Sequence, residues 1–282
     1  MVTKKWIFAV LGLVFLVAVV FYFIYSNRNQ SNQGNISVSG EKVIEYSASG
    51  GPLKILNNAS GKFEYLSDLN VEKDNEIDDV AFSPDGKSYL YSSVYNFPSD
   101  QVLSEEDDIE ARSVYFSDKK GPSIFKAYSP VWLSNGKIIY QDRNSYELVI
   151  YSVTEQKEIS RHDFGFEDSV EIYPLDENNI VALPTTYDVG EITSQIIDLE
   201  TGKIKNYLSG LGLEIKTIVG TNLLAYQQID TSNNALTKII NWETRAQVGE
   251  TGIPVWSLTW DKQGAVKYLD SQTNKLVNLT AQ

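Results

Sequence analysis

The sequence predicts an all-β fold, a β-propeller of five blades, preceded by one transmembrane α-helix. Three observations support this prediction: an uncharged apolar run near the N-terminus, short strand-like segments over the rest of the chain, and turns that recur about every 43 residues. Four short strands in each unit of about 40 to 45 residues are typical of propeller blades. A propeller of six blades is the alternative count, and an irregular β-sandwich is the alternative fold.

The membrane segment comes first along the chain. Residues 6–25 carry no charge, and about 20 apolar residues match the thickness of a bilayer. Trp6 lies at one end of the run, and the pair Lys4 and Lys5 precedes it, so the positive-inside rule keeps residues 1–5 in the cytoplasm. A cleaved signal peptide would have a shorter apolar core and a small-x-small cleavage site, which this sequence lacks.

The next segment is polar. Residues 26–40 are rich in Ser, Asn and Gln, which predicts a flexible tether between the membrane and a folded domain. Residues 41–282 would then form an extracytoplasmic domain at the cell membrane. We therefore expect a single-pass membrane protein whose propeller lies outside the cytoplasm.

The composition narrows the range of partners. The 282 residues include 24 Lys and Arg against 37 Asp and Glu, so the net charge is −13. This charge repels phosphate backbones, and nucleic acid is therefore not an expected partner. Because the chain has no cysteine, disulfides, thiolate metal sites and a cysteine nucleophile are excluded.

Two kinds of turn alternate along residues 41–282. The first kind lies between two apolar strands, at 83–86, 133–136, 176–179, 219–222 and 261–264, and the last residues of these turns are 50, 43, 43 and 42 positions apart. The second kind leads into a polar strand, at 57–62, 117–121, 154–157, 198–203 and 241–245. The series begins with the second kind and ends with the first, so one of five blades would contain both ends of the chain. Extra strands at 43–46 and 275–280 would make six.

One strand-turn-strand segment resembles a known repeat. Residues 80–92, with the turn Ser-Pro-Asp-Gly, resemble the motif of TolB-like and WD-type propeller repeats, and residues 130–140 and 257–264 repeat it more loosely. The resemblance implies a propeller that serves as a platform for proteins or other ligands. It implies no catalytic residue, since none is constant in these repeats.

An acidic face is the main candidate binding site. In an up-and-down propeller both kinds of turn lie at one end of the blades, and the remaining loops lie at the other end. The candidate residues at that other end are Asp74, Asp78, Asp79, Glu105, Glu106, Asp107, Asp108, Asp168 and Glu171. They predict a surface that recruits a basic partner or divalent cations, whereas the alternative is ordinary solubilising surface.

No cofactor is predicted, although calcium is an alternative for the acidic loops. Residues 74–79 and 105–108 offer the oxygen ligands that calcium prefers, but they lack the spaced glycine of a known calcium loop. The single histidine, His162, is expected in a solvated loop between blades. Four tryptophans, at 132, 242, 256 and 260, are expected in the core between blades.

We expect a binding or scaffolding platform for a protein or, second, a carbohydrate, and not an enzyme. Two alternatives remain. An extracytoplasmic glycosidase would use Asp79, Glu171 and Glu214, which open the predicted inner strands, as paired acids; a separation above about 10 Å would exclude it. A structural subunit of an envelope complex would instead expose an apolar patch on a blade edge.

Overall fold

The computed structural model describes the backbone of residues 37–39, 42–45, 53–57, 62–66, 75–95, 112–117, 124–185, 191–229, 235–260, 263–270 and 275–279, and most side chains from residue 80 onward. These residues form 21 β-strands and one short 3-10 helix, η1 (Val255–Ser257). The predicted membrane segment 6–25 lies outside them, as does the predicted tether except for its last strand residues, 37–39. Within the described residues, no helix has the length and apolar character needed to span a membrane.

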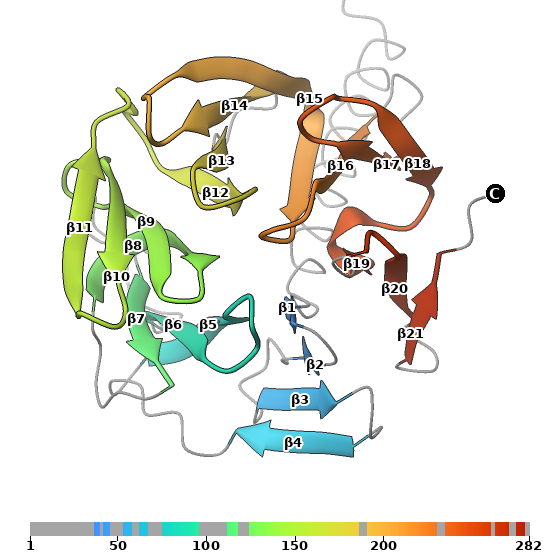
Figure 1. Cartoon of the computed structure of the whole chain (residues 1–282), viewed down its shortest axis with the longest axis horizontal. Coiled ribbons are helices and arrows are strands. Elements are labelled where there is room, and N and C mark those ends of the chain that lie inside the picture. Colours follow the sequence, from blue (N-terminus) through green and yellow to red (C-terminus); the bar gives the residue numbers. More distant parts are fainter. Residues whose placement is uncertain are drawn as a thin grey trace, which may run out of the picture.

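The strands form four antiparallel sheets in which the order in space follows the order in sequence (Figure 1). The first sheet contains β1 (Ser37–Ser39), β2 (Lys42–Glu45), β3 (Leu53–Asn57) and β4 (Lys62–Leu66). The second contains β5 (Asn75–Phe82), β6 (Tyr89–Tyr95), β7 (Arg112–Phe116), β8 (Ile124–Ser134), β9 (Lys137–Asp142), β10 (Leu148–Ser152) and β11 (Lys157–His162). Such a meander of hairpins agrees with the predicted fold class.

The C-terminal half repeats this pattern. The third sheet contains β12 (Val170–Pro174), β13 (Asn179–Pro184), β14 (Glu191–Asp198), β15 (Ile204–Thr217), β16 (Leu223–Ile229), β17 (Ala235–Asn241) and β18 (Gln247–Thr251). The fourth contains β19 (Leu258–Trp260), β20 (Val266–Asp270) and β21 (Lys275–Asn278). Figure 1 shows the sheets arranged around a common centre.

Two long strands divide the larger sheets. The register of β8 shifts between Tyr128 and Val131, and the register of β15 shifts between Leu211 and Glu214. Ser129 and Gly212 lie at these shifts with φ values of 44° and 56°. Each seven-stranded sheet therefore consists of two four-stranded units that share the long strand, β5–β8 with β8–β11 and β12–β15 with β15–β18. We call the first strand of each unit its inner strand.

The turns are built from local hydrogen bonds and residues with positive φ. Gly202 has a φ of 69°, but Gln156 and Arg245 occupy equivalent turn positions with φ values of 54° and 60°. Side-chain oxygens of Asp198 and Asn241 accept hydrogen bonds from backbone N–H groups two and three residues later. Because these Asx turns hold the backbone, the second kind of turn does not need glycine at every repeat.

Both kinds of turn lie at the same end of a unit. Three backbone N–H groups at the start of second-kind turns donate to carbonyls of first-kind turns: Val153 to Gly136, Leu199 to Asn178 and Trp242 to Asn222, at 2.9, 2.7 and 3.0 Å. This pairing confirms the predicted arrangement for three units. The starts of the inner strands therefore lie at the opposite end.

The core lies between successive units. One cluster joins Leu148 to Ile172, a second joins Leu175 to Ile215, and further clusters flank them. Three tryptophans contribute as predicted: the indole N–H of Trp132 donates to the Ala81 carbonyl, and those of Trp242 and Trp260 donate to the carbonyl and hydroxyl oxygens of Thr221. The prediction is wrong for Trp256, which is 36% exposed.

Candidate functional site

The starts of three inner strands bring together a group of polar and aromatic residues. Glu171 lies on β12, Glu214 lies on the last part of β15, and Trp256 lies in η1 directly before β19. Each of them precedes the last residue of its first-kind turn by eight positions. We define the inner cluster as these three residues together with Tyr173 and Lys216, which lie two positions after Glu171 and Glu214.

Hydrogen bonds tie each inner strand to the next unit. The Tyr173 hydroxyl donates to the Glu171 carboxylate, and its oxygen accepts from the backbone N–H of Ile215 on the next inner strand. The ammonium group of Lys216 donates to the Trp256 carbonyl at 3.0 Å. These bonds place the inner cluster at the boundaries between units.

A similar bond lies one unit earlier. The backbone N–H of Ile172 donates to the Ser129 hydroxyl at 2.8 Å. Ser129 lies at the bend of β8, so the bend that divides the sheet also supplies an acceptor to the next inner strand. The position of Glu171 is thereby fixed from the preceding unit as well as from its own strand.

The two carboxyl groups of the inner cluster interact. The pKa of Glu214 is raised, first by desolvation and second by the negative charge of Glu171. Both side chains are nevertheless exposed to water. Glu214 is therefore enclosed by protein and still accessible to solvent, and the described residues contribute no cation to its pKa shift. Such a carboxyl pair can bind a cation or transfer a proton.

Burial also affects the two other titratable groups. Desolvation and the charges of Glu171 and Glu214 raise the pKa of Tyr173 well above its usual value, so Tyr173 stays a hydrogen-bond donor. Desolvation lowers the pKa of Lys216 to about 8. A lysine with this pKa is partly neutral at mildly alkaline pH, which reduces the positive charge that it adds to the cluster.

A buried glutamine positions the segment before β12. The amide of Gln141 is fully buried, and its nitrogen donates to the carbonyls of Tyr146 and Asp168, both at 3.0 Å. Its oxygen accepts from the backbone N–H of Val170 at 2.9 Å. Gln141 thus satisfies three backbone groups and holds the residues that lead to Glu171.

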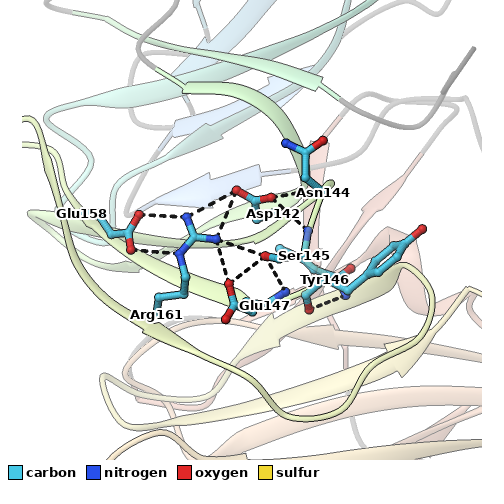
Figure 2. A network of polar contacts seen from close by, with 8 residues as sticks. Asp142, Asn144, Ser145, Tyr146, Glu147, Glu158 and Arg161 are labelled. Atoms are coloured by element: carbon cyan, nitrogen blue, oxygen red, sulfur yellow. Dashed lines mark hydrogen bonds and ion pairs between the residues drawn. The ribbon is translucent and has the colours of Figure 1, made fainter. Parts of the chain in front are cut away.

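A second group of carboxylates lies at the same end of the unit β8–β11. Figure 2 shows Asp142, Glu147 and Glu158 pointing toward the guanidinium of Arg161. The nitrogen–oxygen distances are 3.3, 3.0 and 3.0 Å. Hydrogen bonds from Arg161, above all to Glu158, raise its already high pKa. We call these four residues the Arg161 cluster, in which every carboxylate has a cationic partner.

The predicted acidic face is described only in part. Asp168 is exposed, and its carboxylate accepts from the Ser169 N–H at 2.8 Å. Asp78 and Asp79 lie on β5, where only the backbone is described. Asp74, Glu105, Glu106, Asp107 and Asp108 lie outside the described residues. Of the predicted acidic face, only Asp168 and Glu171 have described side chains, and Glu171 lies in the inner cluster with Glu214, a residue of the glycosidase alternative.

The location of the single histidine differs from the prediction. His162 is the last residue of β11 and not part of a loop. Its Nε2 lies 3.0 Å from the Ser160 hydroxyl, and its ring stacks on Phe164 with 5.8 Å between ring centres. The charged residues of β11 obscure its period-2 pattern, which is why the sequence predicts a loop at His162.

The described residues contain no group of three or more His, Asp or Glu side chains that could hold a metal ion. Residues 105–108, predicted as a calcium alternative, lie outside the described residues. Of the other calcium segment, 74–79, no side chain is described. Calcium therefore stays an untested alternative.

Sequence reasoning missed four residues of the site: Tyr173, Lys216, Trp256 and Gln141. The repeat itself contained a signal for Trp256, because it occupies the position of Glu171 and Glu214 in the next unit. No local pattern identifies Gln141, because two of its three backbone partners lie 27 and 29 residues away in sequence.

No protein-family model and no curated protein matches the chain. Solved structures do. An oligogalacturonate lyase in complex with manganese shares 8% identity at a TM-score of 0.52, with 86% of this chain and 75% of that chain covered. The hydrazine synthase of Kuenenia stuttgartiensis shares 12% identity at a TM-score of 0.51, with 89% and 77% covered.

A chain of the mitotic checkpoint complex shares 13% identity at a TM-score of 0.50, with 89% of this chain and 79% of that chain covered. The fold is β-propeller-like. At these identities the likeness concerns the fold alone, and a propeller-like fold is used by enzymes and by binding proteins. The inner cluster, and not the fold, therefore has to support a statement about function.

Proposed function

We propose that the protein is a binding platform that residues 6–25 anchor in the cell membrane, with the propeller outside the cytoplasm. The platform would bind a protein ligand through the end of the propeller at which the inner strands start. The single observation that supports this proposal best is the coupled carboxyl pair Glu171 and Glu214, which is exposed at this end and has no cationic partner among the described residues.

Charge explains why this pair favours binding. The negative charge of Glu171 disfavours a second charge on Glu214, and a basic side chain of a partner would offset this repulsion. The net charge of −13 would steer a basic partner toward the protein. The Arg161 cluster is a poorer site for a basic partner, because Arg161 already occupies the space between its carboxylates.

The arrangement of the sheets also indicates how many blades the propeller has. The sheets β1–β4 and β19–β21 are separate, and the two larger sheets contribute two units each. This arrangement favours six units over the five that the turn pattern predicted. We propose six blades, in which the three-stranded C-terminal sheet is the smallest.

A crosslinking pull-down tests the binding proposal. Full-length protein is crosslinked in its own membranes and compared with Glu171→Gln/Glu214→Gln. The matched control is Glu200→Gln/Glu243→Gln, which removes two exposed charges from turns at the opposite end. We expect a partner that is captured by the parent and the control but lost with the first variant. Capture of the same partner by all three proteins would contradict the proposal.

A glycosidase is the second candidate, because Glu171 and Glu214 are close enough to interact and have different environments. Glu171 accepts a hydrogen bond from the Tyr173 hydroxyl, whereas desolvation raises the pKa of Glu214. Such a difference is typical of an acid paired with a nucleophile or base. Hydrolysis of 4-nitrophenyl glycosides that is lost in Glu214→Gln would favour this candidate, and no hydrolysis across a broad panel would leave the binding role.

A further inference from the structure

Exposed apolar side chains occur at two kinds of place in the described residues. The six large ones are Ile159, Ile204, Leu211, Ile229, Val248 and Trp256. Ile159, Ile204 and Val248 lie on the outer strands of three different units, one on each strand. Leu211 and Ile229 lie opposite each other on β15 and β16, beside the inner cluster to which Trp256 belongs. Only the second set forms a candidate surface.

The strand register places the apolar pair and Glu214 on one face of the sheet. Leu211 lies opposite Ile229, and Glu214 lies opposite Gln227. Residues directly opposite each other in an antiparallel pair share a face, and so do Gln227 and Ile229, which are two positions apart. Leu211, Ile229 and Glu214 therefore project from the same face of the unit β15–β18.

The segment η1 lies against this same face. The backbone N–H of Val255 donates to the Gln227 side chain at 3.3 Å, and Lys216, two residues after Glu214, donates to the Trp256 carbonyl at 3.0 Å. Trp256 itself remains exposed between the buried residues Val255 and Ser257. An exposed tryptophan thus lies next to the carboxyl pair and the apolar pair.

The backbone at Gly212 keeps this surface exposed. Gly212 has a φ of 56°, and a Cβ atom there would lie 2.9 Å from Cδ1 of Ile229. The extra residue in the register shift turns Leu211 toward solvent, where it is 46% exposed, while Ile229 is 41% exposed. A side chain at position 212 would disturb both residues.

We propose that Leu211, Ile229 and Trp256, together with Glu171 and Glu214, form a docking surface for a protein segment that carries both apolar and basic side chains. This inference rests on the proposed binding function and names its surface and the chemistry of its partner. Apolar side chains of the partner would remove the three hydrophobic residues from water, and tryptophan is among the residues that contribute most at interfaces. A lysine or arginine would lie between the two carboxyl groups.

Charge distinguishes this partner from others. A second copy of the chain also has a net charge of −13, so the acidic surfaces would repel each other. A neutral glycan could stack on Trp256 but would leave the repulsion between Glu171 and Glu214 in place. A segment with basic and apolar residues satisfies both parts of the surface.

A peptide selection tests this chemistry. A displayed library of random 12-residue peptides is selected on the full-length protein in detergent, and enriched peptides are synthesised with a fluorophore. We expect enrichment of Lys or Arg together with Leu, Ile, Phe or Trp. Binding by fluorescence anisotropy should weaken at least about tenfold in Leu211→Ser/Ile229→Ser, in Trp256→Ala and in Glu171→Gln/Glu214→Gln.

Two control variants distinguish the loss of this docking surface from a general loss of exposed hydrophobic residues or of negative charge. Val248→Ser removes an exposed hydrophobic residue from an outer strand, and Glu200→Gln/Glu243→Gln removes two charges at the opposite end; both should bind the peptides as the parent does. Enriched peptides that bind all variants equally would overturn the assigned surface but not the binding function. Enrichment of acidic peptides would overturn the partner chemistry, and a library without any enriched peptide would count against both proposals.

Discussion

The Arg161 cluster and the inner cluster lie at the same end of the propeller-like fold, and both contain carboxylates. They differ in whether those carboxylates form ion pairs. Asp142, Glu147 and Glu158 surround a guanidinium and form ion pairs of 3.0 to 3.3 Å (Figure 2). Glu171 instead accepts a hydrogen bond from the Tyr173 hydroxyl, and its charge contributes to the raised pKa of Glu214. The comparison teaches that the density of acidic residues does not identify a site, and that the carboxylates bound in ion pairs to Arg161 differ in this respect from Glu171 and Glu214.

The largest effect is expected from Gln141, which lies between the two clusters. Gln141→Leu leaves two carbonyls and one N–H without their partner in a buried place, and it should lower the free energy of unfolding by about 3 kcal/mol. Chemical denaturation measures this value. Gln141→Glu keeps the shape and the acceptor for the Val170 N–H but turns a carboxylate oxygen toward the two carbonyls, so it should be at least as destabilising. A loss below about 1 kcal/mol for Gln141→Leu would show that the glutamine does not hold this segment.

A smaller effect is expected when Arg161 is replaced. Arg161→Met removes the cation from among three carboxylates and should lower the free energy of unfolding by about 1 kcal/mol, because the side chain is 32% exposed and partly screened by solvent. The loss should shrink in 0.5 to 1 M salt, where the Debye length is only about 3 to 4 Å. An effect independent of salt would mean that packing, and not charge, makes Arg161 important.

Tyr173→Phe tests the link between units in the inner cluster. The variant removes the donor to Glu171 and the acceptor for the Ile215 N–H, so we expect a loss of about 1 kcal/mol in the free energy of unfolding. Ser129→Ala, which removes the acceptor for Ile172 one unit earlier, should cost a similar amount. If Tyr173→Phe were as stable as the parent, the hydroxyl would not join the two inner strands.

The smallest expected effect is the pH dependence that Glu214 introduces. Its pKa is raised in the folded protein, so the ionised form is disfavoured by folding, and stability decreases as the pH rises through the folded pKa. Glu214→Gln should therefore be more stable than the parent at pH 7 and equal to it well below pH 4.5, the usual value for this carboxyl. Thermal unfolding across this range measures the difference, and a variant that is less stable than the parent at pH 7 would contradict the raised pKa.

The fold could be predicted from the turns. The alternation of two turn kinds and their spacing depends on local backbone chemistry, which is readable in residues such as Gly86 and Asp198. The positions of Glu171 and Glu214 at inner-strand starts follow from the same repeat. The number of units was harder, because the register shifts that divide β8 and β15 depend on the bend at Ser129 and Gly212 and leave no clear break in the hydrophobic pattern.

The chemistry of the site was less accessible from sequence. Whether an acid has a cationic partner depends on side chains from other strands, as with Arg161 and Asp142, which are 19 positions apart. The exposed state of Trp256 likewise depends on how η1 packs against β15 and β16. Composition predicts an acidic face. Only the arrangement of strands shows which carboxylates of the described residues form ion pairs, as in the Arg161 cluster, and which do not, as with Glu171 and Glu214.

The most direct test of the central claim is the affinity of the captured partner for three proteins: the parent, Glu171→Gln/Glu214→Gln and the Arg161-cluster variant Asp142→Asn/Glu147→Gln. Each variant removes two carboxylates from the same end of the fold. We predict that the first variant weakens the dissociation constant at least about tenfold and that the second leaves it within about twofold of the parent. Equal weakening by both variants would contradict the claim that the pair without a cationic partner is the binding site.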